Sequence, residues 1–445
     1  MPDRDSEALQ VRRLGGLRLG PLVAVMFFTV SGGPFGLEGL VGGVGPGIAL
    51  LLLVATPLIY SIPEVLLIGE LASMLPAEGG YYQWVKRAFG HFPGFLNGWL
   101  SWMYSLVDMA LYPVLFLQYA HYVVPWLTAR EAWVAALALI WGATWLNLRG
   151  TRVVGTASGV FVAAVLAPFA ILSAVAAVRW VLAAPLPFPV IPFHAGGMSF
   201  LGALGLGISQ SIWNYSGWDN ASTIGEEIEQ SGRTYPRALA RALPLVTAVY
   251  LLAIVPSLAL TDWRRWTDGA WPDLARTIAG PWLAWWLAAA GMVSAFALFN
   301  ALLLAYSRIP LVLARDRLLP EWFAATDARG TPRRAVLLSA VAYSVFVLLS
   351  FGGLLAADVL LYTAALAMEF AALVRLRGAE PNLRGSFRVP LDRAGLGLLA
   401  TLPVVLLLVG VVLELQSREI GVPGLAVAAV LALIGPLAYG IRRLL

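Results

Sequence analysis

Four carboxylic acids lie near the middle of long apolar segments of this 445-residue chain: Glu38, Glu64, Asp108 and Asp219. A charged side chain at the centre of a bilayer costs at least about 2.5–3.5 kcal/mol, so each acid needs a partner or a function. The only lysine is Lys86, and we expect no arginine deep in any segment. Each acid is therefore either protonated or neutralised by a cationic solute. A proton-coupled carrier uses both states in turn.

Other acids of the apolar segments are expected to have local partners. Glu226 and Glu227 lie toward one end of the sixth segment, within reach of Arg233 and Arg237. This position predicts a structural or gating role. Three further acids lie near segment ends and are expected to face headgroups or a basic loop: Glu70, Asp358 and Glu414.

The composition indicates that lipid is the main solvent of the chain. Hydrophobic residues make up 60% and charged residues 12%, whereas a soluble domain has about half and about a quarter. The polar N-terminus is followed by an apolar run without a small-residue cleavage site, which predicts an uncleaved first helix. The absence of cysteine excludes a disulfide-linked subunit. We interpret the net charge of +5 as loop charge and expect no nucleic-acid partner.

Segment lengths predict an all-α membrane protein with twelve transmembrane helices. A spanning helix needs about 20 mostly apolar residues. The segments that meet this requirement are 17–44, 46–75, 92–124, 131–147, 153–180, 198–228, 236–261, 279–313, 333–352, 354–376, 395–416 and 422–440.

The basic residues predict the orientation of these helices. With the N-terminus inside the cell, 24 of the 30 Lys and Arg residues fall on the cytoplasmic side. This bias agrees with the positive-inside rule. We therefore expect a multi-pass protein of the cell (inner or plasma) membrane with both termini cytoplasmic.

Two of the twelve segments are interrupted at matching positions. The first contains SGGPFG at 31–36, and the sixth contains NYSGWDN at 214–220. Proline and glycine release backbone groups that lipid cannot pair, so such a run is tolerated only beside protein or a wet cavity. Breaks five helices apart are typical of inverted-repeat transporters with a midplane site, although glycine and proline are also simply common in membrane helices.

Several motifs, which follow one another along the chain in the order of a known family, indicate a family resemblance. They are SGGPFGLE (31–38), SIPEVLLIGELASMLPAEGG (61–80), ALYPVLFLQ (110–118), GWDNASTIGEE (217–227) and MEFAALVRLR with FRVP (368–390). Over residues 17–390 the chain resembles the amino acid–polyamine–organocation transporters, and most closely the polyamine/proton symporters typified by plant polyamine uptake transporters.

The resemblance implies a five-plus-five inverted repeat (LeuT-like) with discontinuous helices 1 and 6 and alternating access. The expected units are a cytoplasmic tail (1–16), a first repeat (17–180), a second repeat (198–377) and two final helices (395–443).

The first break is expected to contact the solute. Ser31, Gly32 and Gly33 end one half-helix, and Gly36 begins the next, whose free N–H groups favour an anion such as a carboxylate. Glu38 lies one turn later and counters this effect. It favours an amine without a carboxylate and could bind an ammonium group, or it has a structural role at the extracellular neck.

The second break is expected to supply an ammonium site. Asp219 and the freed carbonyls would bind the cation, or Asp219 caps the next half-helix. Asp108 has a similar expected role, and aromatic rings over the cation would add about 0.5–2 kcal/mol. By resemblance, Trp213 occupies an aromatic gate position. The full predicted substrate-binding set is Ser31, Gly32, Gly33, Phe35, Gly36, Glu38, Tyr104, Asp108, Trp213, Tyr215, Ser216, Gly217, Trp218, Asp219 and Asn300.

The coupling ion is predicted to be a proton. The stretch 294–307 offers few hydroxyls for sodium, and the lysine that some sodium-independent relatives carry is absent at Val165. Polyamine symporters usually carry a second acid where Gln118 stands, and this departure weakens the case for a long polyamine.

The sequence thus predicts a secondary active transporter that imports polyamines or amino acids. An amino acid exchanger of the same superfamily and a transport-deficient amine sensor are the alternatives. An enzyme is not expected, because the three histidines lack metal-ligand spacing and no nucleophile or phosphate-loop motif occurs. No cofactor or metal is expected.

Overall fold

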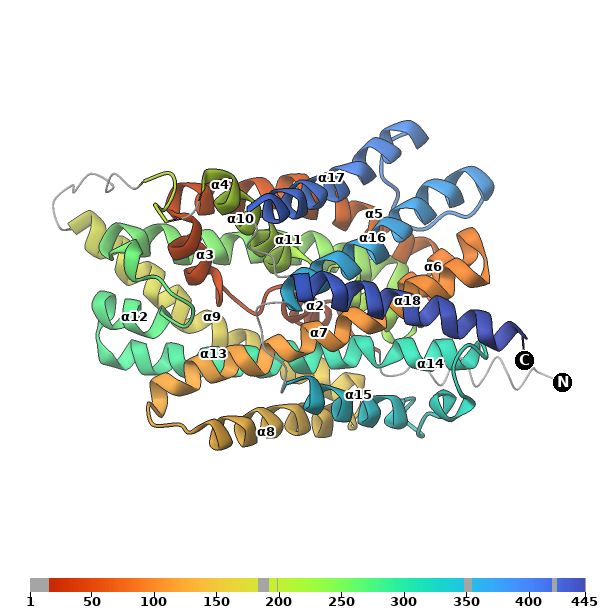
Figure 1. The fold of residues 1–445 in the computed structure, drawn as a ribbon, viewed down its shortest axis with the longest axis horizontal. Helices are drawn as coiled ribbons and strands as arrows, with labels where there is room; N and C mark the ends of the chain where they lie inside the picture. Colours follow the sequence, from red (N-terminus) through yellow and green to blue (C-terminus); the bar gives the residue numbers. More distant parts are fainter. Residues whose placement is uncertain (1–15, 183–191, 198, 348–353, 418–421, 445) are drawn as a thin grey trace.

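The computed structural model describes residues 16–182, 192–197, 199–347, 354–417 and 422–444, and its named elements are all helical. Its long helices lie side by side along the longest axis of the molecule, with α2 (Leu19–Val30) near the centre (Figure 1). The predicted tail, 1–16, lies outside the described residues except for its last position. The side chain of Glu414 also lies outside them.

The first half of the chain forms the helices of the first five predicted segments. After α2 these are α3 (Leu37–Val44), α4 (Pro46–Thr56), the π-helical turn η1 (Pro57–Ser61), α5 (Ile62–Met74), α6 (Gly80–Phe89), α7 (His91–Val123), α8 (Ala129–Asn147) and α9 (Thr151–Leu182).

The second half begins with a short helix and two 3-10 turns. The elements are α10 (Phe200–Tyr215), η2 (Asn220–Thr223), η3 (Gly225–Glu227), α11 (Ser231–Leu260), η4 (Trp263–Arg265), α12 (Trp271–Ala279), α13 (Pro281–Tyr306), α14 (Arg308–Arg315), η5 (Glu321–Ala324), α15 (Arg333–Phe346), α16 (Leu354–Ala379), α17 (Arg393–Ser417) and α18 (Val422–Leu444). Helices α6 and α14 lie at one end of the molecule, and α3 and α12 lie at the opposite end (Figure 1).

Several helical stretches in the described residues are individually long and apolar enough to cross a bilayer. These six are Pro46–Met74, His91–Val123, Thr151–Leu182, Ser231–Leu260, Pro281–Arg315 and Arg393–Leu413. The helical membrane architecture is thereby supported, while the count of twelve spans and the inverted repeat stay predictions.

The first predicted break is confirmed, because the chain leaves helical geometry between α2 and α3. Gly32 has a φ of +64°, and a Cβ at this position would lie 2.5 Å from Leu298, so only glycine fits. The freed carbonyls find side-chain donors: the Ser294 hydroxyl donates to the Gly32 carbonyl at 2.5 Å, and the Trp271 indole donates to the Pro34 carbonyl at 2.8 Å. Side chains of α12 and α13 thus stabilise the break through hydrogen bonds.

The second predicted break is confirmed between α10 and η2. Gly217 has a φ of +98°, and a Cβ there would lie 2.4 Å from the Thr29 carbonyl oxygen at the end of α2. The two broken segments therefore lie directly against each other. The Gly217 N–H donates to the Tyr362 hydroxyl of α16 at 2.9 Å, so a side chain again supplies the missing backbone partner.

We predict that Gly217→Ala strongly destabilises the protein. The substitution forces an L-residue into a left-handed conformation, which costs about 1–3 kcal/mol, and adds a clash with the Thr29 carbonyl. The matched control is Gly159→Ala on α9, where a Cβ would meet no atom within 4 Å. The thermal midpoint of purified protein in detergent should fall by several degrees for Gly217→Ala alone. Equal midpoints for the two variants would contradict this account of the crossing.

Candidate substrate site

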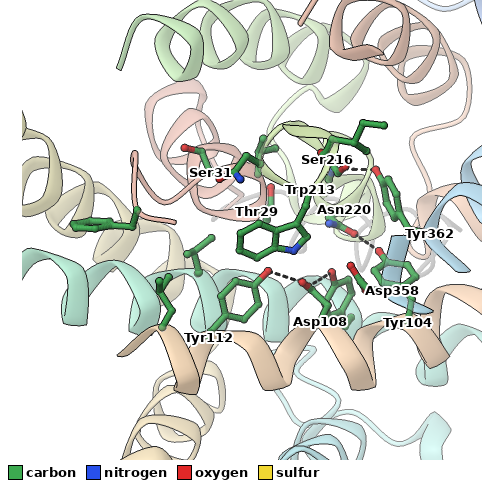
Figure 2. Close-up of a pocket in the computed structure, with 18 residues that line it drawn as sticks. Thr29, Ser31, Tyr104, Asp108, Tyr112, Trp213, Ser216, Asn220, Asp358 and Tyr362 are labelled. Carbon is green, nitrogen blue, oxygen red and sulfur yellow. Dashed lines mark hydrogen bonds between the residues drawn. The ribbon is translucent and has the colours of Figure 1, made fainter. Parts of the chain in front are cut away.

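A cavity of about 40 Å³ lies where the two breaks meet α7, α13 and α16. This volume holds a few water molecules and is smaller than a diamine or an amino acid. The polar lining faces inward from several elements (Figure 2). The labelled residues are Thr29, Ser31, Tyr104, Asp108, Tyr112, Trp213, Ser216, Asn220, Asp358 and Tyr362.

Asp108 on α7 is a buried acid whose two oxygens are held by tyrosines. The Tyr112 hydroxyl donates to Oδ1 at 2.8 Å, and the Tyr306 hydroxyl of α13 donates to Oδ2 at 2.9 Å. Asp108 and Tyr112 are four residues apart, which brings both to one face of the helix. Tyr104, four residues earlier on the same face, donates to Asn220 Oδ1 at 2.8 Å.

Asp358 on α16 lines the same cavity. The sequence prediction that it faces headgroups or a basic loop is therefore wrong. Only 5% of this residue is exposed, because it lies on the face of α16 that carries Tyr362 four residues later and points into the bundle. Its Oδ1 atom is buried and has no hydrogen-bond partner among the described residues. Asp358 is close enough to Asp108 for their charges to interact.

The described lining contains these two acids and no protein cation. The described residues around the cavity include no Lys, Arg or His. A buried carboxylate without a cation is costly, whereas one that meets a cationic guest is compensated. The cavity therefore suits a positively charged solute.

Aromatic side chains form the remaining walls. Trp213 of α10 lies in the middle of the close-up with its indole nitrogen toward Asp108 (Figure 2). Phe35 of the first break closes one edge and packs edge-to-face on Tyr119 and Phe169, with ring centroids 4.9 and 5.0 Å away. A cation in the cavity would thus lie among ring faces that can stabilise it.

The structure brings about half of the predicted site residues into the cavity. Those in the lining are Ser31, Phe35, Tyr104, Asp108, Trp213, Ser216 and Gly217. Those outside the lining are Gly32, Gly33, Gly36, Glu38, Tyr215, Trp218, Asp219 and Asn300. Sequence reasoning missed Tyr112, Tyr306, Asp358 and Tyr362, although the repeated spacing of four between acid and tyrosine on α7 and α16 could have indicated three of them.

Glu38 is engaged by the protein at the end of the molecule that holds α3 and α12. Its Oε1 accepts hydrogen bonds from the Tyr119 hydroxyl at 2.5 Å and the Gly269 N–H at 3.0 Å, and its Oε2 accepts one from the Gly36 N–H at 2.8 Å. These contacts favour the structural alternative for Glu38 over ammonium binding. Gln118 also lies against Gly269, outside the cavity lining, so its identity does not determine the charge of the cavity.

The freed carbonyls of the second break, which are expected to bind an ammonium group, already accept hydrogen bonds from the protein. The Tyr215 carbonyl accepts a hydrogen bond from the Trp218 indole at 2.7 Å. The Asn214 carbonyl accepts from Tyr250 at 2.7 Å, and the Trp218 carbonyl accepts from Tyr235 at 2.8 Å. In a membrane interior the protein itself satisfies these groups, since no bulk water is present to do so.

Two more predicted residues contact neighbouring helices. Asn300 on α13 accepts a hydrogen bond from Asn147 of α8 at 2.8 Å. Asp219 approaches the Tyr362 hydroxyl at 2.8 Å, and Glu64 of α5 approaches the same hydroxyl at 2.8 Å. Tyr362 lines the cavity, whereas Asp219 and Glu64 do not. These two acids therefore lie behind Tyr362 as seen from the cavity.

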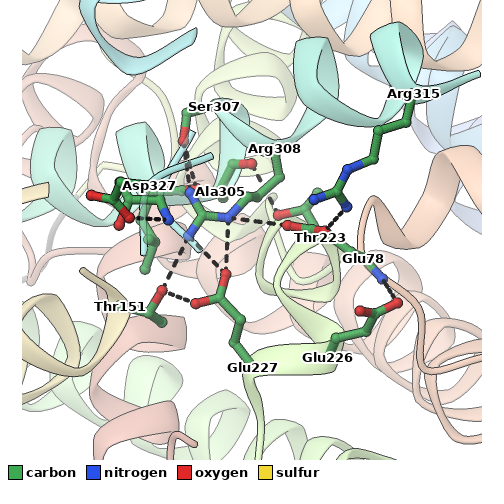
Figure 3. A network of polar contacts seen from close by, with 12 residues as sticks. Glu78, Thr151, Thr223, Glu226, Glu227, Ala305, Ser307, Arg308, Arg315 and Asp327 are labelled. Carbon is green, nitrogen blue, oxygen red and sulfur yellow. Dashed lines mark hydrogen bonds and ion pairs between the residues drawn. The ribbon is translucent and has the colours of Figure 1, made fainter. Parts of the chain in front are cut away.

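A polar network near α14 joins segments that are far apart in the sequence (Figure 3). Arg308 is 1% exposed, and its Nη2 donates to Glu227 Oε1 at 2.7 Å and to Thr151 Oγ1 at 3.1 Å. Glu78, in the turn before α6, lies 3.7 Å from Arg308 and also pairs with Arg315. Burial raises the pKa of Glu78, even though both guanidinium groups oppose this effect.

The partners predicted for two acids at this end need correction. Glu227 pairs with Arg308, and Glu226 accepts the Glu78 N–H at 3.2 Å, so Arg233 and Arg237 are not their partners. The reason is that Arg308, at the start of α14, lies 2.7 Å from Glu227 although the two residues are far apart in the sequence. Glu70 forms an ion pair with Arg377 at 2.5 Å, which agrees with its expected basic surroundings.

The fold and the cavity define a class of protein that an independent comparison also identifies. A family model described as amino acid permease matches residues 22–432. The chain therefore belongs to the amino acid permease family of the amino acid–polyamine–organocation superfamily. It is a multi-pass membrane transporter and not an enzyme.

Individual relatives match nearly the whole chain. Polyamine transporter RMV1 of Arabidopsis thaliana is 35% identical over 433 residues, which cover 96% of this chain and 86% of that protein. Polyamine transporter PUT1 of Oryza sativa subsp. japonica is 34% identical over 444 residues, which cover 98% and 81%. An uncharacterised transporter of Mycobacterium tuberculosis is 30% identical over 308 residues, which cover 66% and 64%.

We predict that Arg308→Met lowers the thermal midpoint of the purified protein. Removal of the buried guanidinium leaves Glu227 and Glu78 without their shared cation, and breaking a buried pair in this way costs about 3–5 kcal/mol. Arg264→Met is the control, because that side chain is 70% exposed and its pair with Asp262 is on the surface. A midpoint for Arg308→Met equal to that of the control would show that the network contributes little to stability.

Proposed function

We propose that this protein is a proton-coupled secondary transporter that imports small polyamines by alternating access. The observation that carries the proposal is a cavity with two acids and no protein cation in its described lining. Asp358 keeps a buried oxygen without a partner, and such an atom is costly unless a donor reaches it. A primary or secondary ammonium group from a solute in the cavity would supply such a donor.

The first break supports an amine without a carboxylate over an amino acid. A substrate carboxylate would need free N–H groups there. The N–H of Gly32 already donates within the chain at 3.1 Å, that of Gly33 donates to the Ser31 hydroxyl at 3.1 Å, and that of Gly36 donates to Glu38 at 2.8 Å. These three donors would have to be released before an amino acid could use them.

A substrate with more than one ammonium group fits the number of acids. Asp108 and Asp358 both face the cavity, and each can receive one cationic group. Two relatives that match nearly the whole chain are named polyamine transporters, which supports the same substrate class.

The transport cycle follows from the size of the cavity and the polar network. We propose twelve spans with a five-plus-five inverted repeat, placed in the cell membrane with both termini cytoplasmic. In this orientation the Arg308 network closes the cytoplasmic end. Substrate release to the cytoplasm then requires these contacts to separate, and substrate access requires the cavity to widen around Trp213.

We expect polyamines to stabilise the purified protein in a thermal-shift screen. Spermidine and putrescine should raise the midpoint in a concentration-dependent manner, because they neutralise the cavity acids. Leucine and arginine should have little effect. A rise with arginine or leucine alone would favour the amino acid exchanger, and spermidine binding without flux in proteoliposomes would favour the amine sensor.

We predict that Asp358→Asn weakens spermidine binding about 10- to 100-fold. The substitution keeps the shape of the side chain and removes one charge-assisted hydrogen bond, which is worth about 1.5–3 kcal/mol. Affinity should be measured by titration calorimetry, with Asp273→Asn on the exposed face of α12 as the control. Unchanged affinity for the Asp358 variant would refute its assigned role in amine binding.

A further inference from the structure

Three groups meet at the hydroxyl of Tyr362, behind the cavity wall. Glu64 Oε1 and Asp219 Oδ1 each lie 2.8 Å from the hydroxyl oxygen. The Gly217 N–H donates to the same oxygen at 2.9 Å. The hydroxyl thus has three neighbours at hydrogen-bonding distance: one comes from α5, and two come from the break between α10 and η2.

The donors and acceptors balance only if this cluster contains an extra proton. A tyrosine hydroxyl has one hydrogen to donate and two lone pairs that accept. Gly217 uses one lone pair. The hydroxyl hydrogen satisfies one carboxyl group, so the other carboxyl must be protonated and donate to the second lone pair. Two ionised carboxylates would instead leave one oxygen facing a lone pair at 2.8 Å.

Glu64 is the better candidate for the protonated member. It is 0% exposed, and its Oε2 has no hydrogen-bond partner in the segments that the structure describes. An ionised carboxylate with an unsatisfied oxygen is far more costly than a neutral carboxylic acid in the same place. None of the ion pairs of the described residues includes Glu64 or Asp219.

Within the described part of the chain, no cationic side chain is close enough to act on the cluster. The titratable groups that act on Glu64 or Asp219 are a carboxyl group and phenols, and they come from η1, α6, α7, α11 and α16. They are Tyr60, Tyr81, Tyr104, Tyr235 and Glu369. A proton is thus the positive charge that this environment accommodates.

We propose that the Glu64–Tyr362–Asp219 cluster is the binding site of the transported proton. This inference rests on the proposed function, proton-coupled polyamine uptake, and assigns the proton to residues separate from the amine-binding acids. Tyr362 joins the two sites, because the same side chain lines the cavity and contacts both carboxyl groups.

The cluster also connects protonation to the broken helix. The proton enters from water on one side, binds to a carboxylate of the pair, and returns to water on the other side. When it leaves, two negative charges remain next to one hydroxyl and repel each other. The Gly217 N–H is bound to that same hydroxyl, so the repulsion acts directly on the break between α10 and η2.

The test compares gradient-driven uptake with exchange in proteoliposomes that contain the full-length protein and radiolabelled spermidine. For the wild type, external acid should accelerate uptake, because the outward-facing cluster is then protonated. Glu64→Gln imitates the protonated acid permanently. We expect it to keep spermidine counterflow within about threefold of the wild type and to lose the acceleration by a pH gradient.

The matched control is Glu369→Gln on α16. Glu369 is equally buried, and its charge acts on the cluster, but it does not contact the Tyr362 hydroxyl. The control therefore separates contact with the hydroxyl from a nearby charge. This variant should keep the acceleration by external acid. Loss of the acceleration in Glu369→Gln but not in Glu64→Gln would overturn the assignment.

A second variant keeps the test decisive if Glu64→Gln does not fold. Tyr362→Phe retains both carboxyl groups and removes the hydroxyl between them. The number of protons taken up per spermidine bound, measured by calorimetry in two buffers of different ionisation enthalpy, should differ from that of the wild type. An unchanged number would overturn the proposal.

The wild-type protein separates this inference from the function on which it rests. Absence of any spermidine flux in the wild type would refute the proposed function. Spermidine flux that ignores the pH gradient would refute proton coupling. Flux that follows the gradient in the wild type and equally in Glu64→Gln would refute only the assignment of the proton to this cluster.

Discussion

The direct contact between the two broken helices is the constraint on which the site depends. Gly217 lies so close to the Thr29 carbonyl that no Cβ fits between them. Both segments, α2 and α10, end their helical geometry near this crossing. Lipid offers no partners for the released backbone groups, so side chains of the neighbouring helices must supply them. Tyrosines of α11 and α16 and a tryptophan of α12 do so. The polar interior of this apolar protein is therefore a consequence of the crossing.

Identical side-chain chemistry acquires different roles through its surroundings. Glu70 and Glu227 are neutralised by arginines, and Glu38 is satisfied by neutral donors. Glu64 shares a hydroxyl with a second acid, and Asp358 retains an oxygen without a partner among the described residues. Counting buried acids therefore does not reveal which of them meets the solute. The hydrogen-bond partners of each acid, together with its position inside or outside the cavity lining, make that distinction.

The sequence was sufficient to predict where two helices are interrupted. It was insufficient to predict which side chains meet across neighbouring helices. Glycine and proline clusters have a local effect on the backbone, so both interruptions were predictable from their positions. Periodicity indicates which residues share one face of a helix, but not which neighbouring helix that face meets. For this reason the sequence does not predict that Asp358 lines the cavity instead of facing headgroups or a basic loop. Nor does it predict that Glu227 pairs with Arg308 instead of Arg233 or Arg237. The hydrogen bonds to the freed carbonyls were not predictable for a similar reason, since their donors Tyr235 and Tyr250 lie on another helix.

Arg308 is a single cation that serves several anionic and polar positions at once. Glu227, Thr151 and Glu78 belong to three different segments, and all of them contact the same guanidinium group. Displacing that group breaks these three contacts together, whereas the Glu78–Arg315 pair and the hydrogen bond from Thr151 to Glu227 do not involve it. The three segments are therefore coupled through one shared ion, and a movement of that ion would loosen all three of them at once.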